Sequence, residues 1–195
     1  RAVGILSVPV MNDWMGGEGS TMMEPVILMA LLVLLVTAVG TDIRSSRIPN
    51  WLTFPAMGFA LTLHTWLNGI QGALFCLAGL GTGLGLLFSV YLLRGIGAGD
   101  VKLMAAIGAM VGPHGVLSVV LLSALTGGLY AIGAMGYQWG LAATGQRLVY
   151  AACGVVLAGG TGWMKEFQLP FKLRYGLAIA GGTLLFLGGV HPFGG

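Results

Sequence analysis

The sequence predicts an all-α membrane protein, built as a bundle of about six transmembrane helices. Of its 195 residues, 56% are hydrophobic and another 35 are glycine. Charged residues make up only 8% of the chain, against about 25% in soluble domains. The mean hydropathy is +0.91. A chain of this composition lacks the polar side chains needed to cover a soluble core, so we expect it to fold in a bilayer.

Six apolar stretches are the candidate spans, and they cover residues 25–41, 52–67, 70–93, 101–112, 115–137 and 175–190. A span needs about 20 residues. The first, third and fifth stretches satisfy this, whereas the second and sixth are marginal. The fourth is long enough only if its helix starts near Gly99 and runs past Pro113. A further run, "LVYAACGVVLAGG" at 148–160, is short and glycine-rich, and we interpret it as an interfacial or re-entrant segment.

The sequence predicts two parts, a short N-terminal extension and a membrane domain. Residues 1–24 begin without methionine and hold three of the six acidic residues. We interpret them as an N-terminal extension, of which residues 1–21 are equally consistent with a vector-derived sequence, because Met22 or Met23 would be a natural start. Residues 25–195 form the membrane domain.

Basic residues occur in alternate connections between the spans. They are Arg44, Arg47, Arg94, Lys102, Arg147, Lys165, Lys172 and Arg174. The connections at 68–72 and 112–115 contain no Lys or Arg. The positive-inside rule therefore places the basic connections in the cytoplasm and both termini outside. The net charge of +3 is dispersed, so we expect contact with membrane lipids and none with nucleic acid.

Glycines four residues apart recur in "GLGTGLG" at 79–85, as the pairs Gly79 with Gly83 and Gly81 with Gly85. Small residues at this spacing let helices approach closely in lipid. The pattern predicts a tight bundle and says nothing about chemistry.

Outside the N-terminal extension the acidic residues are Asp42, Asp100 and Glu166. Glu166 stands beside Lys165 in a polar connection, where a solvated charge is the expected role. Asp42 and Asp100 lie at the ends of apolar runs, on the same predicted face of the membrane. An ionisable group at membrane depth is costly and suggests function, although pairing with neighbouring Arg or Lys at the headgroups is the alternative.

Two carboxylates brought together can share one proton, which supplies an acid and a base near neutral pH. The base can activate water against a carbonyl group while the acid protonates the leaving group. His64, His114 and His191 have no metal-ligand spacing, and we expect structural or solvated roles for them. Cys76 and Cys153 lie in apolar runs and are expected to be buried. We therefore expect no metal and no cofactor.

Two segments resemble the conserved blocks of the type IV prepilin peptidases, which are membrane aspartyl proteases. "DIRSSRIPN" at 42–50 is similar to their first block, and "GAGDVKLMAAIGA" at 97–109 to their second, which carries the Gly-x-Gly-Asp motif. The blocks begin about 55 residues apart. "RYGLAIAGG" at 174–182 resembles their last-helix segment. The likeness extends over residues 25–190.

The resemblance implies specific roles. It implies that Asp42 and Asp100 are the catalytic pair and that Gly97 and Gly99 shape the start of the helix carrying Asp100. Other positions matched by the two blocks are Pro49, Asn50, Lys102, Arg44 and Arg47. Of these, Pro49 and Asn50 would set the turn into the second helix. Lys102 either tunes the pair or extends to the headgroups, and the two arginines set topology and contact lipid or substrate.

The chain departs from the family pattern in three respects. Larger members carry a cytoplasmic domain with four zinc-binding cysteines between their first spans, so this chain resembles the minimal form. Those members also methylate the new amino terminus of the pilin, an activity that the sequence leaves open because no S-adenosylmethionine site is recognisable. Arg174 stands where proline or a small residue is expected.

The expected function is that of an intramembrane aspartyl endopeptidase in a bacterial or archaeal cytoplasmic membrane. Its partner would be a prepilin or pseudopilin whose short basic leader is cleaved at the cytoplasmic face. The alternative is a small proton-coupled transporter or channel subunit that uses Asp42 and Asp100 as a relay. That alternative predicts acids near the bilayer midplane, whereas these lie at one edge.

Overall fold

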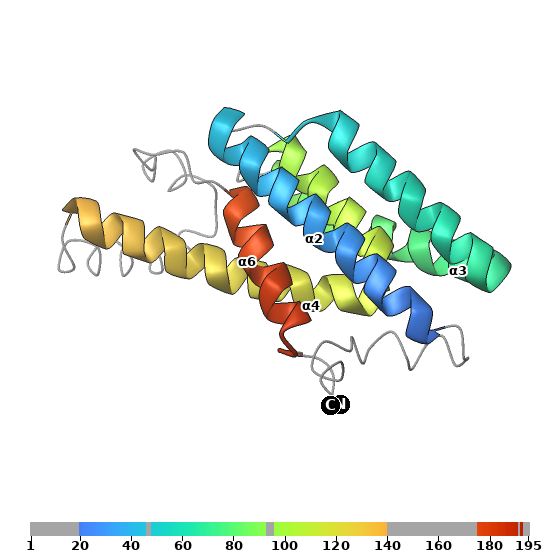
Figure 1. The fold of residues 1–195 in the computed structure, drawn as a ribbon. Helices are drawn as coiled ribbons and strands as arrows, with labels where there is room; N and C mark the ends of the chain where they lie inside the picture. Colours follow the sequence, from blue (N-terminus) through green and yellow to red (C-terminus); the bar gives the residue numbers. More distant parts are fainter. Residues whose placement is uncertain (1–19, 46–47, 93–95, 140–174, 191, 193–195) are drawn as a thin grey trace. The chain divides into compact units, whose positions relative to one another are not determined.

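The computed structural model describes residues 20–45, 48–92, 96–139, 175–190 and 192. This part of the chain contains four helices, α2 (Ser20–Ser45), α3 (Asn50–Leu92), α4 (Ala98–Trp139) and α6 (Tyr175–Leu187) (Figure 1). It contains no strand, so the prediction of an all-α chain is confirmed for the described residues. Several predictions fall outside them, namely those for residues 1–19, the segment 148–160, Arg47, Cys153, Glu166 and His191.

The described residues form four helices where six spans were expected, because two of these helices are long and broken. At about 1.5 Å per residue, the 43 residues of α3 measure about twice the roughly 30 Å of a hydrocarbon core. Gly69 interrupts α3 with φ 59° and ψ −140°, and Gly112 interrupts α4 with φ 77° and ψ 178°. Only glycine adopts such angles without strain. The fourth expected span does begin beside Gly99 and continue beyond Pro113, but through this break.

The chain divides into two compact units, which we describe separately. The first comprises residues 1–126 and 174–195, and the second comprises residues 127–173. The described part of the second unit is the end of α4, where the side chains of Leu129 and Tyr137 are exposed. The other described helices, and α4 as far as Thr126, belong to the first unit.

The core of the first unit is centred on the beginning of α4. Residues 103–111 are all buried, which marks an apolar helix enclosed on every side. The α2 helix contributes one stripe, formed by Leu31, Leu34, Leu35 and Ala38, at the three- and four-residue spacing of a single helix face. Helix α2 also packs on α3 and on α6.

Glycines bring α3 against α4. A Cβ atom at Gly79 would collide with the carbonyl oxygen of Gly108, and one at Gly83 would lie 2.7 Å from that of Met104. Close approach at Gly79 and Gly83 is therefore confirmed. A Cβ atom at Gly81 or Gly85 would have no neighbour within 4 Å, so the prediction that these two also form a packing pair is wrong. They lie on the opposite face of the helix, which is exposed.

Where α3 and α4 break, a buried histidine joins them. The ring of His64 is completely buried, and its Nε2 lies 3.3 Å from the carbonyl oxygen of Met110. The break at Gly112 leaves carbonyls at the end of the first α4 segment without helical donors, so Nε2–H donates to one of them. The structural role expected for His64 is confirmed, although it lies in the interior, whereas His114 is exposed.

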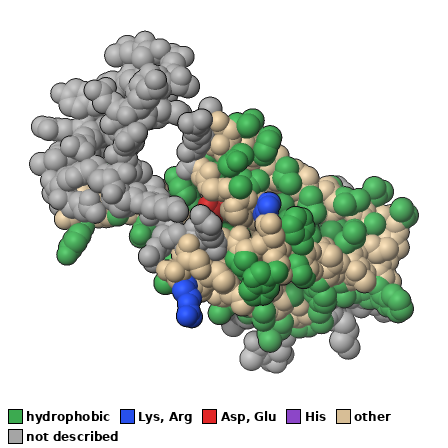
Figure 2. Space-filling view, turned by 90° about the horizontal axis from the view of Figure 1, so that it is seen from above, with side chains coloured by type: hydrophobic (Ala, Val, Ile, Leu, Met, Phe, Trp, Pro, Cys, Tyr) green, Lys and Arg blue, Asp and Glu red, His purple; other side chains and the backbone are tan. Residues whose placement is uncertain are grey.

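The surface of the first unit is strongly apolar. Trp66, Ile70 and Val36 are 85%, 76% and 71% exposed, and hydrophobic side chains cover much of the face shown in Figure 2. Three described helical segments are long and apolar enough to cross a membrane, Pro25–Ser45, Asn50–Leu92 and Ala98–Tyr137. Because such an exposed apolar surface suits lipid better than water, the prediction of an integral membrane protein is supported.

Candidate active site

Asp42 lies in the last turn of α2, directed into the bundle. It follows Ala38 by four residues and so continues the buried stripe of that helix. Its exposed fraction is only 7%. The neighbouring residues Ile43 and Arg44 are exposed. The register of α2 therefore selects the aspartate, and not the arginine, for the interior.

Asp100 lies in the first turn of α4, where local hydrogen bonds hold it. The carbonyl oxygen of Gly97 accepts the N–H groups of Asp100 and Val101, at 3.1 and 3.4 Å. In return, Oδ2 of Asp100 accepts the N–H of Gly97 at 3.3 Å. This is the half of a capping box in which the side chain at the third helical position, here Asp100, accepts the N–H of the N-cap residue, here Gly97. It restrains the carboxylate of Asp100, which is only partly buried.

The two glycines before Asp100 lie against different neighbours. A Cβ atom on Gly99 would lie 3.1 Å from the Cβ of Ile48 and 3.3 Å from its backbone nitrogen. One on Gly97 would lie 3.2 Å from Oδ2 of Asp100. Gly99 thus lets α4 begin against the segment that follows α2. The expected site-shaping role of both glycines stays a prediction.

The start of α6 lies against Asp42. A Cβ atom on Gly176 would lie 2.8 Å from Oδ2 of Asp42 and 3.1 Å from its Cγ, so the backbone of α6 rests on that carboxyl group. The preceding residue, Tyr175, is partly buried and interacts electrostatically with Asp100. The start of α6 thus lies against the carboxyl group at the end of α2.

Sequence reasoning did not assign a role to Tyr175 or Gly176. It placed them in a segment resembling a last helix, but nothing in their spacing indicated which side chains they would contact. Their proximity to Asp42 and Asp100 is a tertiary feature, since they lie far from both along the chain.

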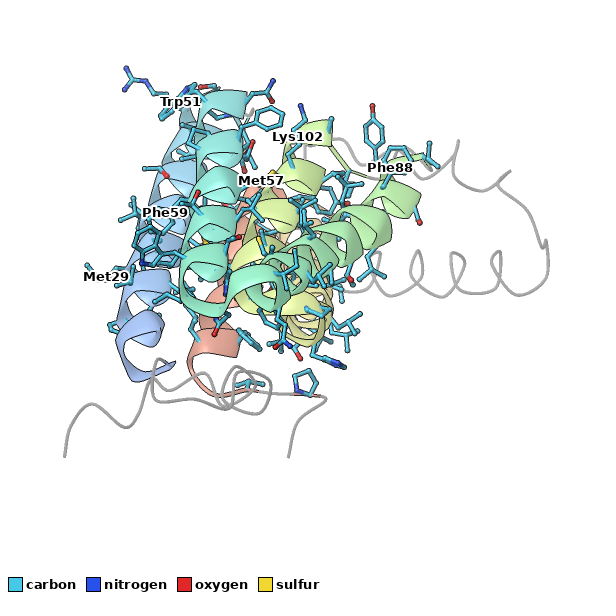
Figure 3. The ribbon with its side chains drawn as sticks, turned by 90° about the vertical axis from the view of Figure 1, so that its right-hand side faces the viewer. Met29, Trp51, Met57, Phe59, Phe88 and Lys102 are labelled. Carbon is cyan, nitrogen blue, oxygen red and sulfur yellow. The ribbon has the colours of Figure 1, made fainter. Side chains whose placement is uncertain are left out.

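Lys102 makes its described contacts with α3. Its Nζ donates to Oδ1 of Asn50 at 2.9 Å and lies 5.6 Å from the centre of the Phe54 ring, which is cation–π distance. Figure 3 shows Lys102 at the same end of the bundle as Trp51 of α3. The carbonyl oxygen of Pro49 accepts the N–H of Leu52 at 3.2 Å at the start of α3, and the expected role of Pro49 and Asn50 in setting this turn stays a prediction.

The basic residues of the first block are only partly described. Arg44 is exposed in the last turn of α2, where a positive charge complements the helix dipole. Arg47 lies outside the described residues. Among those that are described, no three His, Cys, Asp or Glu residues group as metal ligands would.

Comparison with known proteins identifies the family. The profile of the type IV leader peptidase family matches residues 29–132, more than half of the chain. The chain belongs to the type IV leader peptidase family. The matched span contains Asp42, Gly97, Gly99 and Asp100 of the candidate site. It ends before Tyr175 and Gly176.

A curated relative supports this membership of the leader peptidase family. The chain is 30% identical over 186 residues to a prepilin leader peptidase/N-methyltransferase of Xanthomonas campestris pv. campestris. The alignment covers 92% of this chain and 59% of that relative, so the chain spans well under two thirds of the relative's length. No solved structure matches the chain significantly.

Proposed function

We propose that this leader peptidase family member is an intramembrane aspartyl endopeptidase that removes the short basic leader of a prepilin or pseudopilin. The observation that carries the proposal is that the end of α2, which holds Asp42, and the start of α4, which holds Asp100, lie together: Gly99 lies against Ile48 just after α2, and Gly176 of α6 rests on the carboxyl group of Asp42. Family membership supports the reaction class, and this convergence supports the aspartyl mechanism.

The surroundings of the two carboxyl groups suit them to different roles. Asp100 lies at a helix N-terminus, accepts a backbone N–H and is partly exposed. Those features stabilise an ionised carboxylate that water can reach. Asp42 is buried near the C-terminus of α2, where the helix dipole opposes a negative charge. We therefore assign the general base to Asp100 and the general acid to Asp42.

The reaction then proceeds without a metal or a covalent enzyme intermediate. Asp100 removes a proton from water, and the resulting hydroxide attacks the carbonyl carbon of the scissile peptide. Asp42 donates its proton to the carbonyl oxygen, which yields a neutral tetrahedral diol. When the C–N bond breaks, the proton held by Asp100 passes to the departing amine and a diol proton returns to Asp42. The products are the leader carboxylic acid and the new amino terminus of the pilin.

We infer six membrane crossings from the four helices. The breaks at Gly69 and Gly112 divide α3 and α4 into two parts each, and α2 and α6 add one crossing each. The Lys/Arg distribution then turns the aspartates toward the cytoplasm. A basic leader would lie at that face, attracted by anionic headgroups, while the hydrophobic pilin segment stays in the bilayer.

Cleavage of a membrane-inserted prepilin by the purified chain tests the proposal. Asp42→Asn and Asp100→Asn should each lower the rate by at least about 100-fold, the usual contribution of a general acid or base. Glu166→Gln is the carboxylate control and should cleave normally. Inside-out vesicles should process a prepilin supplied from outside, because their cytoplasmic face is exposed.

Normal cleavage by either aspartate variant would disprove the dyad mechanism. Proton flux through vesicles containing the parent, without cleavage, would instead favour the transporter alternative. Processing only by right-side-out vesicles would reverse the proposed orientation.

A further inference from the structure

An exposed tryptophan lies at each end of the first part of α3, the part before the break at Gly69. Trp51 and Trp66 are 68% and 85% exposed, and Asn50 and Asn68 lie within two residues of them. Tryptophan is enriched where a bilayer meets water, because its ring is apolar and its indole N–H is polar. The two tryptophans therefore mark the two edges of the bilayer on this helix.

The surface between the two tryptophans suits hydrocarbon. Phe59 is exposed there, and the exposed threonines return their hydroxyls to carbonyl oxygens of the same helix. Thr62 donates to Gly58 at 2.7 Å. Thr65 donates to Leu61 at 2.6 Å. A lipid-facing surface needs its polar groups satisfied within the protein in this way, since acyl chains offer them no partner.

The marked edges are closer together than those of an ordinary bilayer. Trp51 and Trp66 are fifteen residues apart, which is about 22 Å along a helix, whereas a typical hydrocarbon core is about 30 Å thick. The acidic residues at the two ends of α2, Glu24 and Asp42, are eighteen residues apart, about 27 Å. Any tilt of a helix shortens the thickness that it spans, so both lengths are upper limits.

Two other segments of the first unit are short in the same way. The 13 residues of α6 measure about 20 Å, and Gly189, with φ 91°, turns the chain out of that helix. The first part of α4, from Ala98 to the break at Gly112, measures about 21 Å. The part of α3 after Gly69 is longer, but it runs obliquely to the first part (Figure 3), so its length does not separate the two faces further.

We propose that Trp51 and Trp66 anchor the first unit in a bilayer thinned locally to a hydrocarbon core of about 20–25 Å, so that its preferred lipid partners have short acyl chains. A span shorter than the surrounding hydrocarbon is accommodated by thinning the bilayer, at a cost that rises with each ångström of mismatch. The inference rests on the membrane crossings proposed above, because it needs the break at Gly69 to lie at the membrane edge. It does not need the aspartyl chemistry.

Thermal melting of the full chain in phosphatidylcholine vesicles tests the inference. The vesicles share one headgroup and have monounsaturated acyl chains of fourteen, eighteen or twenty-two carbons. The melting temperature should be highest with fourteen carbons and fall by about 5 °C or more across the series, because mismatch destabilises the folded bundle. Trp66→Leu should flatten this dependence, since it removes one anchor. Phe59→Leu, the control, removes an aromatic ring from the middle of the same surface and should leave the dependence unchanged.

Depth-dependent quenching of tryptophan fluorescence by brominated lipids measures the two anchors directly. In vesicles with eighteen-carbon chains, variants that keep only Trp51 or only Trp66 should both be quenched best by bromine near the headgroups. In a bilayer that has not thinned, the two indoles could not both reach a headgroup layer, and one of them would be quenched best by bromine deep in the acyl chain.

A melting temperature that does not depend on chain length, or that is highest with twenty-two carbons, would overturn the inference. So would deep quenching of either tryptophan, or a Trp66 that no brominated lipid reaches. A chain-length dependence that Trp66→Leu does not weaken would show that the tryptophans do not set the thickness, and would overturn it as well.

The proposed function can fail separately, because neither measurement uses cleavage. An inactive parent chain would overturn the proposed function and leave this inference standing. Labelling of Gln71→Cys from the cytoplasmic side only would overturn the proposed crossings and this inference together. Labelling of Gln71→Cys from outside, with melting that does not depend on chain length, would overturn this inference alone.

Discussion

Glycines in two regions of the first unit face different kinds of neighbouring atoms. We name them the dyad end, formed by Asp42, residues 97–102, Tyr175 and Gly176, and the helix crossing, formed by Gly79, Gly83, Met104 and Gly108. At the crossing, the missing side chains face backbone carbonyls. At the dyad end, the missing side chain of Gly176 faces a carboxyl group.

This difference predicts different consequences for the same kind of substitution. Backbone of a packed helix cannot move aside without shifting the whole element, so a side chain at the crossing should affect folding. The end of an aspartate side chain can rotate, so a methyl group at Gly176 should displace the carboxyl group and leave the bundle assembled. We therefore expect substitutions at the crossing to change stability and substitutions at the dyad end to change activity.

The largest effect on folding is expected for Gly79→Val. Its side chain would enter the space of the Gly108 carbonyl and should lower the free energy of unfolding by about 3 kcal/mol, the upper part of the usual range for overpacking. Detergent melting curves measure this, and activity should fall with the folded fraction. Gly81→Val is the control, because Gly81 has no neighbour within 4 Å of its Cβ position. Equal stability of the two variants would refute the assigned crossing.

The second prediction is a loss of activity without a loss of stability. Gly176→Ala should reduce cleavage on the order of 100-fold, because displacing a reacting group by about 1 Å has that consequence. Its melting temperature should stay near that of the parent. Gly181→Ala on the same helix is the control, since its methyl group would meet Thr126 at an ordinary 3.6 Å. If Gly176→Ala cleaves at the parental rate, the contact between α6 and Asp42 is irrelevant to activity.

The smallest effect is expected for Lys102→Met, which retains most of the apolar stem. It removes the hydrogen bond to Asn50 and the contact with Phe54, which together should lower stability by about 1 kcal/mol. Activity should change less than about threefold and the pH profile should not move, since Lys102 is engaged with α3. Asn50→Ala should have the same small effect. A shifted pH profile for Lys102→Met alone would show that the lysine tunes the dyad after all.

Much of the site was predictable because it depends on local sequence. The motif "GAGD" contains its own N-cap, and Asp100 bonds back to Gly97 within a single turn. Asp42 falls on the buried stripe of α2 by simple four-residue spacing from Ala38. Composition and the length of the apolar runs predicted the helical fold of the described residues, since a long apolar run in a bilayer can satisfy its backbone groups within its own helix.

Tertiary structure determined which residues of one helix contact another helix, a choice that spacing along the sequence leaves open. Gly79 with Gly83 and Gly81 with Gly85 have the same spacing, and only the presence of α4 on one side makes the first pair buried and the second exposed. The sequence indicated no partner for Lys102, and the position of α3 provides Asn50 as one. Gly176 lies against the carboxyl group of Asp42 only because α6 packs against α2. The physical reason is common to all three cases, since a side chain's partner on another helix is set by how the helices pack, which residue spacing within one helix does not specify.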